Sequence, residues 1–326
     1  MRTMRIAFIA DEITSFIKDH DSTWSIMQAA FNTRDEVYYA HASSLSVSAG
    51  EGLAEFVQLN KEFFKFQETN KTKLVEFPIE VSSEALELDS MDLIFMRSDP
   101  PVDTAYITAC QILALCKKAR VINNPNSLIT YNEKLSILNF PALITETLVS
   151  GYKAEIKNFI TKLGKAVIKP LDGMAGSGIF VVEAGDKNLG SILEVSLERS
   201  STLMIQKYIP EISQGDKRIV MINGEVKGAL IRVPTKKDHR ANLAAGGNFA
   251  KYELTKRDKE ICASLKSFLV ENGILLAGVD VIGDYLTEIN ITSPTCLQEI
   301  DRLEGNKGEA KLAYEILKAL GSKINS

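Results

Sequence analysis

The sequence predicts a mixed fold in three lobes, α/β in the first lobe and α+β in the other two. The chain has 326 residues, which is too many for one small core. Strand-like and helix-like segments alternate as far as Pro125, and hairpins and glycine-rich turns follow it. We therefore place the lobes at 1–125, 126–205 and 206–326.

Composition narrows the class of protein. Hydrophobic residues make up 45% of the chain and charged residues 25%, as in ordinary globular proteins. A net charge of -4 provides no general attraction for nucleic acid. No apolar run reaches the ~20 residues of a membrane helix, and the first apolar stretch is too short for a signal peptide. We expect a cytoplasmic protein that acts on small molecules, with no nucleic-acid or membrane partner.

The cysteines and histidines argue against two further chemistries. The four cysteines show neither CxxC nor mixed Cys/His spacing, so the sequence predicts no zinc site, and a cytoplasmic chain is not expected to form disulfides. The three histidines have no evident nucleophile partner nearby, which disfavours a Ser/His/Asp hydrolase.

The first lobe is predicted to contain a parallel sheet. Strand-like apolar runs occupy 4–11, 37–41 and 92–99, and a polar, mixed region separates the last two. The segment 103–120 has apolar residues at helical spacing and ends in basic residues, as a helix C-terminus favours. Strands that alternate with helices are typical of parallel sheets.

The middle lobe is predicted to hold two helices, a strand–turn–strand unit, a third helix and a strand. These elements occupy 127–138, 153–164, 166–183, 188–198 and 202–209. Ser127 is a plausible N-cap of the first helix, and Gly164 stops the second.

The third lobe is predicted to contain two hairpins and a helix. The first hairpin covers 217–234 and turns at Asn223–Gly224, a strong hairpin signal. An amphipathic helix covers 257–273, and a second pair of strands covers 275–290. The segment 232–254 is long, polar and basic, and a loop of that length in a compact domain is usually functional or disordered.

Lys169 ends a strand-like run and precedes a glycine-rich turn. Glycine and small or flexible residues make up most of this turn: Gly173, Met174, Ala175, Gly176, Ser177 and Gly178. Backbone N–H groups in such a turn can cradle phosphate oxygens. A plain hairpin turn explains the same stretch, and the motif is neither a Walker A loop nor a GxGxxG turn before a helix. Lys134 lies in the predicted helix 127–138 and is an ordinary surface lysine unless the fold brings it beside Lys169.

Asp280, Glu288 and Asn290 form a possible cation site. Residues two apart share one face of a strand, so Glu288 and Asn290 point together and Asp280 can face them from the paired strand. Two carboxylates and an amide oxygen suit Mg²⁺ or Mn²⁺ beside phosphate oxygens. A half-exposed hairpin explains the same spacing. The hydroxyl-rich end of this strand, Thr292–Thr295, suits a bound substrate.

Three residues at the start of the long loop and within it, Arg232, Arg240 and Asn242, could hold a carboxylate, because guanidinium groups bind carboxylates in a bidentate manner. They could equally be surface residues of a disordered loop. Asp99 precedes two prolines, and we interpret it as a rigid strand exit rather than as a substrate contact.

The order of these signals, and seven stretches of sequence, closely resemble the bacterial glutathione synthetases, which are ATP-grasp enzymes. The stretches are "MRSDPPVDTAY", "NEKL", "VIKPLDGMAGSGIF", "GDKR", "NLAAGG", "GVDVIGD" and "LTEINITSPTC". The resemblance runs, with gaps, from the first strand to about residue 300. It implies a three-lobed ATP-grasp fold behind an N-terminal parallel-sheet domain, and the ligation of γ-glutamylcysteine to glycine with conversion of ATP to ADP and phosphate.

The resemblance also implies roles for residues. Lys134, Lys169 and the glycine-rich turn would hold the phosphates of ATP. Backbone groups between the lobes would read adenine, at Gln206, Lys207, Tyr208 and Ile209. Mg²⁺ or Mn²⁺ would bind Asp280, Glu288 and Asn290. The dipeptide and the intermediate would contact Arg232, Arg240, Asn242, Ser293 and Thr295. The two arginines would also stabilise developing negative charge, and the family implies a homo-oligomer.

The chemistry fits a site without a protein nucleophile. A carboxylate becomes a good electrophile once the γ-phosphoryl group makes it an acyl phosphate, and the protein mainly neutralises charge and aligns the reactants. A lid over 233–248 would keep water from that intermediate. Two other hypotheses stay open from the residues: another ATP-grasp carboxylate–amine ligase with a different substrate, and a non-catalytic nucleotide-binding module.

Overall fold

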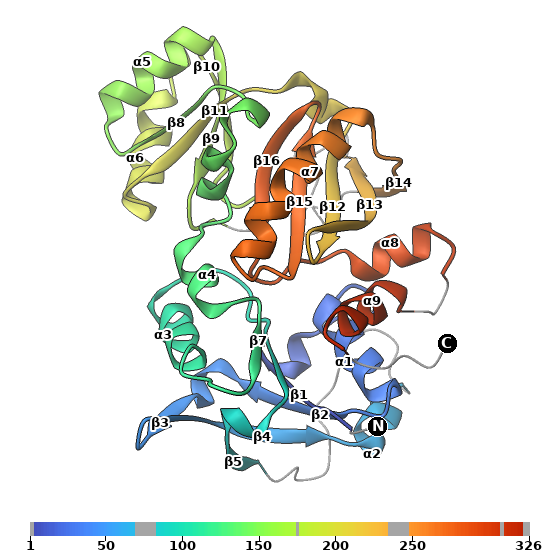
Figure 1. Cartoon of the computed structure of the whole chain (residues 1–326). Coiled ribbons are helices and arrows are strands. Elements are labelled where there is room, and N and C mark those ends of the chain that lie inside the picture. Colours follow the sequence, from blue (N-terminus) through green and yellow to red (C-terminus); the bar gives the residue numbers. More distant parts are fainter. Residues whose placement is uncertain (1–2, 69–82, 174–175, 234–247, 307–309, 322–326) are drawn as a thin grey trace.

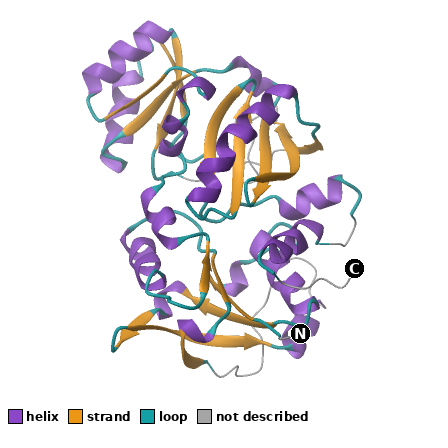
Figure 2. Cartoon of the chain, in the orientation of Figure 1, coloured by secondary structure: helices purple, strands orange, loops and turns teal. Residues whose placement is uncertain are grey.

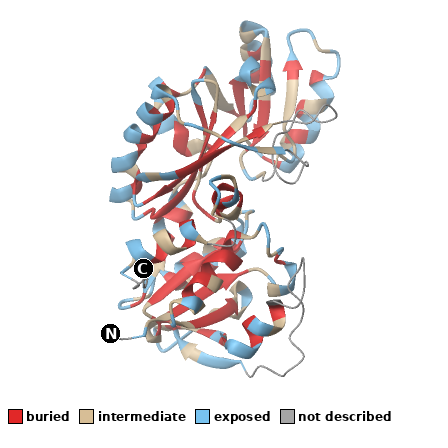
Figure 3. Ribbon diagram, turned by 90° about the vertical axis from the view of Figure 1, so that its right-hand side faces the viewer, coloured by how far each residue is buried: buried red, intermediate tan, exposed pale blue. Residues whose placement is uncertain are grey.

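The computed structural model contains three sheets, which Figure 1 shows one after another along the chain. The described residues are 3–68, 83–173, 176–233, 248–306 and 310–321. Within them no helix is long and apolar enough to cross a membrane. Figure 2 shows helices beside each sheet, and Figure 3 shows that buried residues follow the strands. Short 3-10 helices connect elements at Ile13–Ser15, Ala42–Ser44, Leu88–Ser90, Leu135–Asn139, Pro141–Leu143 and Pro210–Ser213.

The N-terminal sheet confirms the predicted parallel core and extends it. Its strands lie in the order β3-β4-β2-β1-β6-β7, and β5 pairs with β4. The four strands β2, β1, β6 and β7 are parallel, with bounds Glu36–His41, Arg5–Ala10, Leu93–Met96 and Arg120–Ile122. The antiparallel part lies in the region predicted only as mixed, with β3, β4 and β5 at Ser46–Ser48, Glu51–Leu59 and Glu84–Glu87. Helices α1, α2 and α3 span Ser22–Asn32, Lys61–Glu68 and Thr104–Leu113.

The helix predicted over 103–120 ends earlier, at Leu113, and the basic residues lie beyond it. The carboxylate of Asp89 accepts the backbone N–H groups of Lys117, Lys118 and Ala119 at 2.8–3.0 Å. These bonds hold the segment outside the helix before β7 begins at Arg120.

The middle sheet has the order β10-β9-β11-β8 and carries two helices on one side (Figure 1). The strands β8 to β11 span Thr147–Ser150, Lys165–Pro170, Phe180–Glu183 and Leu203–Lys207, and the helices α5 and α6 span Lys153–Leu163 and Leu189–Arg199. Ile156 of α5 and Leu193 of α6 share one apolar core with Ile168 and Ile205 of the sheet. The predicted strand–turn–strand unit is confirmed as β9 and β10.

The helix predicted over 127–138 is broken. Helix α4 (Pro125–Thr130) has Asn124 as its N-cap, not Ser127, and a 3-10 helix follows only at Leu135. The side chain of Asn132 accepts the N–H groups of Lys134 and Leu135 at 3.0 and 3.1 Å, which starts a new turn there. Lys134 therefore lies between two short helices and not on the surface of a long one.

The third sheet has the order β14-β13-β12-β15-β16, and both predicted hairpins are confirmed. The strands β12 to β16 span Asp216–Ile222, Glu225–Val233, Asn248–Lys251, Leu276–Ile282 and Tyr285–Asn290. Asn223 and Gly224 have φ angles of 52° and 74°, as a two-residue hairpin turn requires. Helix α7 (Lys256–Glu271) begins with a capping box formed by Thr255 and Asp258.

Two C-terminal helices connect the third sheet to the N-terminal lobe. Helix α8 (Leu297–Leu303) packs on β13, and α9 (Lys311–Ala319) packs on α1 (Figure 1). The buried side chains of Ile316 and Leu312 share an apolar core with Phe8 and Ile26 of the N-terminal lobe. The chain end therefore ties the first lobe to the lobe that carries β12–β16.

Candidate active site

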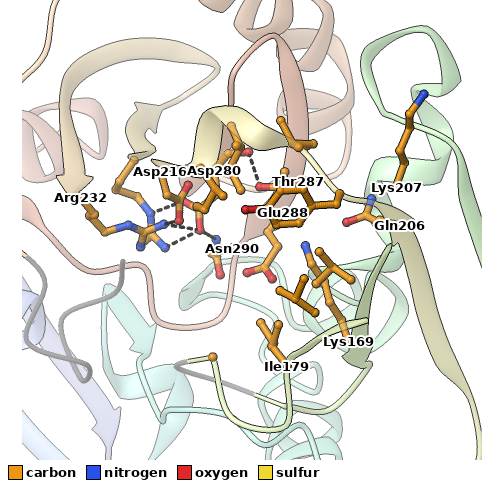
Figure 4. Close-up of a pocket in the computed structure, with 18 residues that line it drawn as sticks. Lys169, Ile179, Gln206, Lys207, Asp216, Arg232, Asp280, Thr287, Glu288 and Asn290 are labelled. Atoms are coloured by element: carbon orange, nitrogen blue, oxygen red, sulfur yellow. Dashed lines mark hydrogen bonds and ion pairs between the residues drawn. The ribbon is translucent and has the colours of Figure 1, made fainter. Parts of the chain in front are cut away.

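A cavity of about 220 Å³ lies between the middle and third sheets (Figure 4). A second cavity of about 240 Å³ adjoins it and shares Glu288, Asn290, Arg218 and Arg232 with it. The second cavity extends to the N-terminal lobe at Asp99. The two cavities bring three of the predicted groups together, namely the two lysines, the carboxylates of the second hairpin and the strand end after β16.

Lys169 projects from β9 into the first cavity, beside Glu288 (Figure 4). The side chain is buried, and burial lowers the pKa of its ammonium group. The Glu288 carboxylate partly offsets this shift, and the ammonium of Lys134 adds to it. The ammonium groups of Lys169 and Lys134 therefore lie close enough to repel each other, and a bound anion would relieve this repulsion.

Lys134 is buried in the wall of the second cavity, and its Nζ donates to the carbonyl of Gly173 at 2.5 Å. The fold thus brings Lys134 to the glycine-rich turn. In that turn Gly178 has a φ of 73°, and a Cβ on it would lie 2.8 Å from the Pro170 ring, so glycine is required there. Met174 and Ala175 lie outside the described residues.

The segment Asn132–Lys134 links three parts of the site. Asn132 donates to the carbonyl of Leu171 at 3.0 Å, at the start of the glycine-rich turn. Glu133 Oε1 accepts from Ile291 N, Thr292 N and Thr292 Oγ1 at 2.8, 3.0 and 2.8 Å. The Glu133 carbonyl also accepts the N–H of Ile289 at 2.9 Å. The carboxylate next to Lys134 therefore holds the strand end that follows Asn290.

Asp280 and Glu288 face each other across β15 and β16, and Asn290 lies opposite Gly278. Asp280 accepts from Arg218 at 2.5 and 3.0 Å, from Arg232 at 2.9 Å and from Asn290 Nδ2 at 3.2 Å. Burial raises the pKa of the Asp280 carboxyl, but the two guanidinium groups outweigh burial and lower it to about 2. Asp280 is therefore a charged, fully bonded carboxylate.

Two of the three residues predicted to bind a cation, Glu288 and Asn290, have an oxygen that can reach an ion in the cavity. Glu288 projects into the cavity between Lys169 and Asn290 (Figure 4). Because Asn290 donates its Nδ2 to Asp280 and to the Gly278 carbonyl, its Oδ1 is the atom that a cation would use. Glu288 and Asn290 thus offer two hard oxygen donors on one face, of the kind that Mg²⁺ prefers. The Asp280 carboxylate orients Asn290 by accepting its Nδ2 hydrogen. Asp280 would bind an ion itself only by giving up a bond to Arg218 or Arg232.

Arg218 and Asp216, on β12, complete the charged cluster and were missed from the sequence. Asp216 lies opposite Arg232 on β13, and Arg218 lies opposite Asp280 on β15. Arg232 also forms an ion pair with Asp216. Burial raises the pKa of Asp216 to about 6, and the Arg232 charge opposes this shift. The stretch "GDKR" held a signal for this cluster. Asp216 and Arg218 are two residues apart and therefore share one face of the strand.

Apolar side chains line the first cavity around the crossing between lobes. The apolar lining residues are Val167, Ile179, Val181, Ile209, Ile212 and Ile282. Gln206, Lys207 and Tyr208 line the same space, and Lys165 Nζ lies 4.6 Å from the centroid of the Tyr208 ring. An apolar cavity wall suits a flat heterocycle such as adenine.

Ser293 and Thr295 line the second cavity together with Asp99 and Pro100. Arg97, which is buried, donates to the Pro294 carbonyl and to Thr23 Oγ1 at 3.0 Å each, and so fixes this segment against the N-terminal lobe. Our interpretation of Asp99 as a strand exit only is therefore incomplete, because its loop forms a cavity wall. Arg240 and Asn242 lie outside the described residues.

Comparisons with known proteins give consistent results. The family model "Prokaryotic glutathione synthetase, ATP-grasp domain" matches residues 133–305, and the model of that family's N-terminal domain matches 4–128. The chain is 43% identical to a glutathione synthetase of Synechococcus elongatus over 99% of both chains. It is 41% identical to a glutathione synthetase of Neisseria meningitidis over 93% of this chain and 94% of the other.

Solved structures show the same fold at low sequence identity. A D-cycloserine synthetase superposes with a TM-score of 0.67 at 11% identity, over 97% of this chain and 99% of that one. A RiPP-associated ATP-grasp ligase from Chryseobacterium gregarium superposes with a TM-score of 0.64 at 16% identity, over 99% and 98%. These likenesses concern the ATP-grasp fold, which the sequence had predicted.

Proposed function

The chain belongs to the prokaryotic glutathione synthetase family, and from this premise we propose how its residues carry the reaction. The protein is an ATP-dependent carboxylate–amine ligase that joins γ-glutamylcysteine to glycine and releases ADP and phosphate. One observation carries the residue assignment. The first cavity, which contains the buried Lys169, shares Arg218, Arg232, Glu288 and Asn290 with the second cavity, which Lys134, hydroxyl groups and Asp99 of the N-terminal lobe also line.

The first cavity would bind ATP. Its apolar end, with Gln206, Lys207, Tyr208 and Ile209, would take the adenine. Lys134 and Lys169 would hold the phosphates, because both are buried lysines beside the glycine-rich turn. The turn itself would close over the phosphates through Gly173, Met174, Ala175, Gly176, Ser177 and Gly178, of which Met174 and Ala175 are outside the described residues.

Glu288 and Asn290 would hold the cation, and Asp280 would complete this set by orienting Asn290. A bound Mg²⁺ or Mn²⁺ ion would neutralise charge on the phosphate oxygens. Glu288 is well placed for this role because it lines both cavities, with Lys169 in the first and Lys134 in the second.

The second cavity would bind the substrate whose carboxylate is activated. An oxygen of the cysteinyl carboxylate attacks the γ-phosphorus, and the bond from that phosphorus to ADP breaks. The glycine amine then attacks the acyl carbon, loses a proton, and phosphate leaves. Arg232, with Arg218, would stabilise the charge that develops on the oxygens. Ser293 and Thr295 would position the dipeptide, and Arg240 and Asn242 would act from the lid segment 233–248.

The wider organisation remains part of the proposal. Three lobes, 1–125, 126–205 and 206–326, would close on the substrates, and the enzyme would be a cytoplasmic homo-oligomer. Light scattering after gel filtration tests the oligomeric state.

ADP release tests the function. We expect release that requires γ-glutamylcysteine, glycine and Mg²⁺ together, and weak or no release with other carboxylates or amines. Binding of ATP without ADP release in the complete mixture would overturn the function. Equal release with an unrelated carboxylate–amine pair would indicate a different ATP-grasp ligase.

A further inference from the structure

The substrate carries one charge that the assignment above does not match. γ-Glutamylcysteine has two carboxylates and one α-ammonium group. The arginines and hydroxyl groups of the second cavity suit the carboxylates. An ammonium group leaving water needs an acidic partner, because an unpaired charge in a closed site is costly.

Three carboxylates line the second cavity within the described residues: Asp99, Glu133 and Glu288. Glu133 already accepts three hydrogen bonds from Ile291 and Thr292. Glu288 lies beside Lys169 at the phosphate end. Of the three, Asp99 alone belongs to the N-terminal lobe, and it lines the cavity together with Pro100, Ser293 and Pro294.

The loop that carries Asp99 is held in place. The Asp99 N–H donates to Asp11 Oδ2 at 2.9 Å, and the Ser293 side chain forms a hydrogen bond with Asp99. Burial raises the pKa of Asp99; Ser293 and Arg97 oppose this shift, whereas Asp11 and Asp21 add to it. A cationic ligand group would relieve the repulsion among these three acids.

We propose that Asp99 binds the α-ammonium group of the γ-glutamyl half of the substrate and thereby selects for it. This inference rests on the proposed function of the second cavity. Asp99 is anionic and Arg232 is cationic, and both line the second cavity. A zwitterionic substrate requires both charges. Ser293 lies beside Asp99, so the ammonium site and the segment proposed to hold the dipeptide are adjacent.

The test compares two substrates in two proteins. Glutarylcysteine differs from γ-glutamylcysteine only by lacking the α-amino group. In the wild type we expect kcat/KM to fall by about 10- to 100-fold with glutarylcysteine, because the Asp99 carboxylate then lacks its partner. In Asp99→Asn we expect kcat/KM for γ-glutamylcysteine to fall by a similar factor, whereas glutarylcysteine is used about as well as by the wild type. The KM for ATP should not change.

The outcomes separate the two hypotheses. If the wild type releases no ADP with γ-glutamylcysteine and glycine, the proposed function fails, and this inference with it. If the wild type works but uses both substrates equally, or Asp99→Asn keeps the full preference for γ-glutamylcysteine, only this inference is overturned. Glu84→Gln removes an exposed carboxylate of the same lobe and should keep wild-type selectivity. Should Asp99→Asn not fold, as judged by thermal unfolding, Asp99→Ala provides the same comparison.

Discussion

The two charged regions of the site are built in opposite ways. In the cluster of Asp216, Arg218, Arg232 and Asp280, every member has an ion-pair partner on a neighbouring strand. Lys169 is equally buried, but within the described residues it forms no ion pair, and burial lowers its pKa. Paired charges keep one geometry with or without a ligand, whereas a buried lysine without an ion pair is stabilised when an anion arrives. The cluster is therefore suited to positioning, and Lys169 to binding.

The largest expected effect is at Glu288, which faces both regions. We expect Glu288→Ala to lower kcat by about 1,000-fold or more, because the cation loses a direct ligand. The protein should stay folded, since Glu288 is only half-buried. Steady-state ADP release and thermal unfolding measure the two effects, and wild-type turnover in this variant would disprove the cation assignment.

Lys169→Met should impair the reaction with ATP without lowering the stability of the protein. We expect kcat to fall by about 100- to 1,000-fold, because a charge opposite the phosphates is lost. The melting temperature should stay equal or rise, because the variant no longer buries an ammonium group. A marked loss of stability would show that Lys169 has a structural partner, and the contrast between Lys169 and the paired cluster would then be wrong.

Asp280→Asn, unlike Lys169→Met, should lower the stability of the protein. Removing the Asp280 charge leaves the buried Arg218 guanidinium without a carboxylate and leaves Arg232 with Asp216 alone, and we expect a loss of about 3–5 kcal/mol in the free energy of unfolding. Asp284→Asn, in the exposed turn of the same hairpin, is the matched control and should change it by less than about 0.5 kcal/mol. Urea denaturation measures both variants, and equal stabilities would contradict the assignment.

The same pair predicts the pH dependence of stability. The pKa of Asp280 is lowered from its usual 3.8 to about 2 in the folded protein. Its contribution to stability should therefore be complete above the unfolded value and be lost as the pH falls through the folded one. Urea denaturation across this acid range should show a steeper loss in the wild type than in Asp280→Asn.

A smaller effect is expected at Glu133, which connects the segment of Lys134 to the end of β16. Glu133→Ala leaves the N–H groups of Ile291 and Thr292 unpaired, and we expect a loss of about 1–3 kcal/mol in stability together with a lower kcat. Glu133→Gln keeps an acceptor oxygen and should therefore retain most of the stability and most of kcat. If neither variant changes kcat, the link between Lys134 and the end of β16 has no role in the reaction.

Much of the fold was predictable because it depends on local signals. The turn at Asn223–Gly224 and the helix stop at Gly164 follow from residues within one or two positions. The helix predicted over 127–138 was wrong because Asn132 bonds the backbone of Lys134 and Leu135, and periodicity does not reveal that competition. The C-terminal helices went unpredicted because α9 is defined by its contact with α1, far away in sequence.

By itself, the sequence determined the residue types of the site, the strand faces of Glu288 and Asn290, and the flexible turn after Lys169. These depend on side-chain chemistry and on periods of two or a few residues. Only the tertiary structure decided which charges are paired. Asp280 meets Arg218 and Arg232 through strand register, Lys134 reaches Gly173 through a broken helix, and Asp99 reaches Ser293 from another lobe. Pair energies depend on burial and distance, and neither is written in the spacing of residues along the chain.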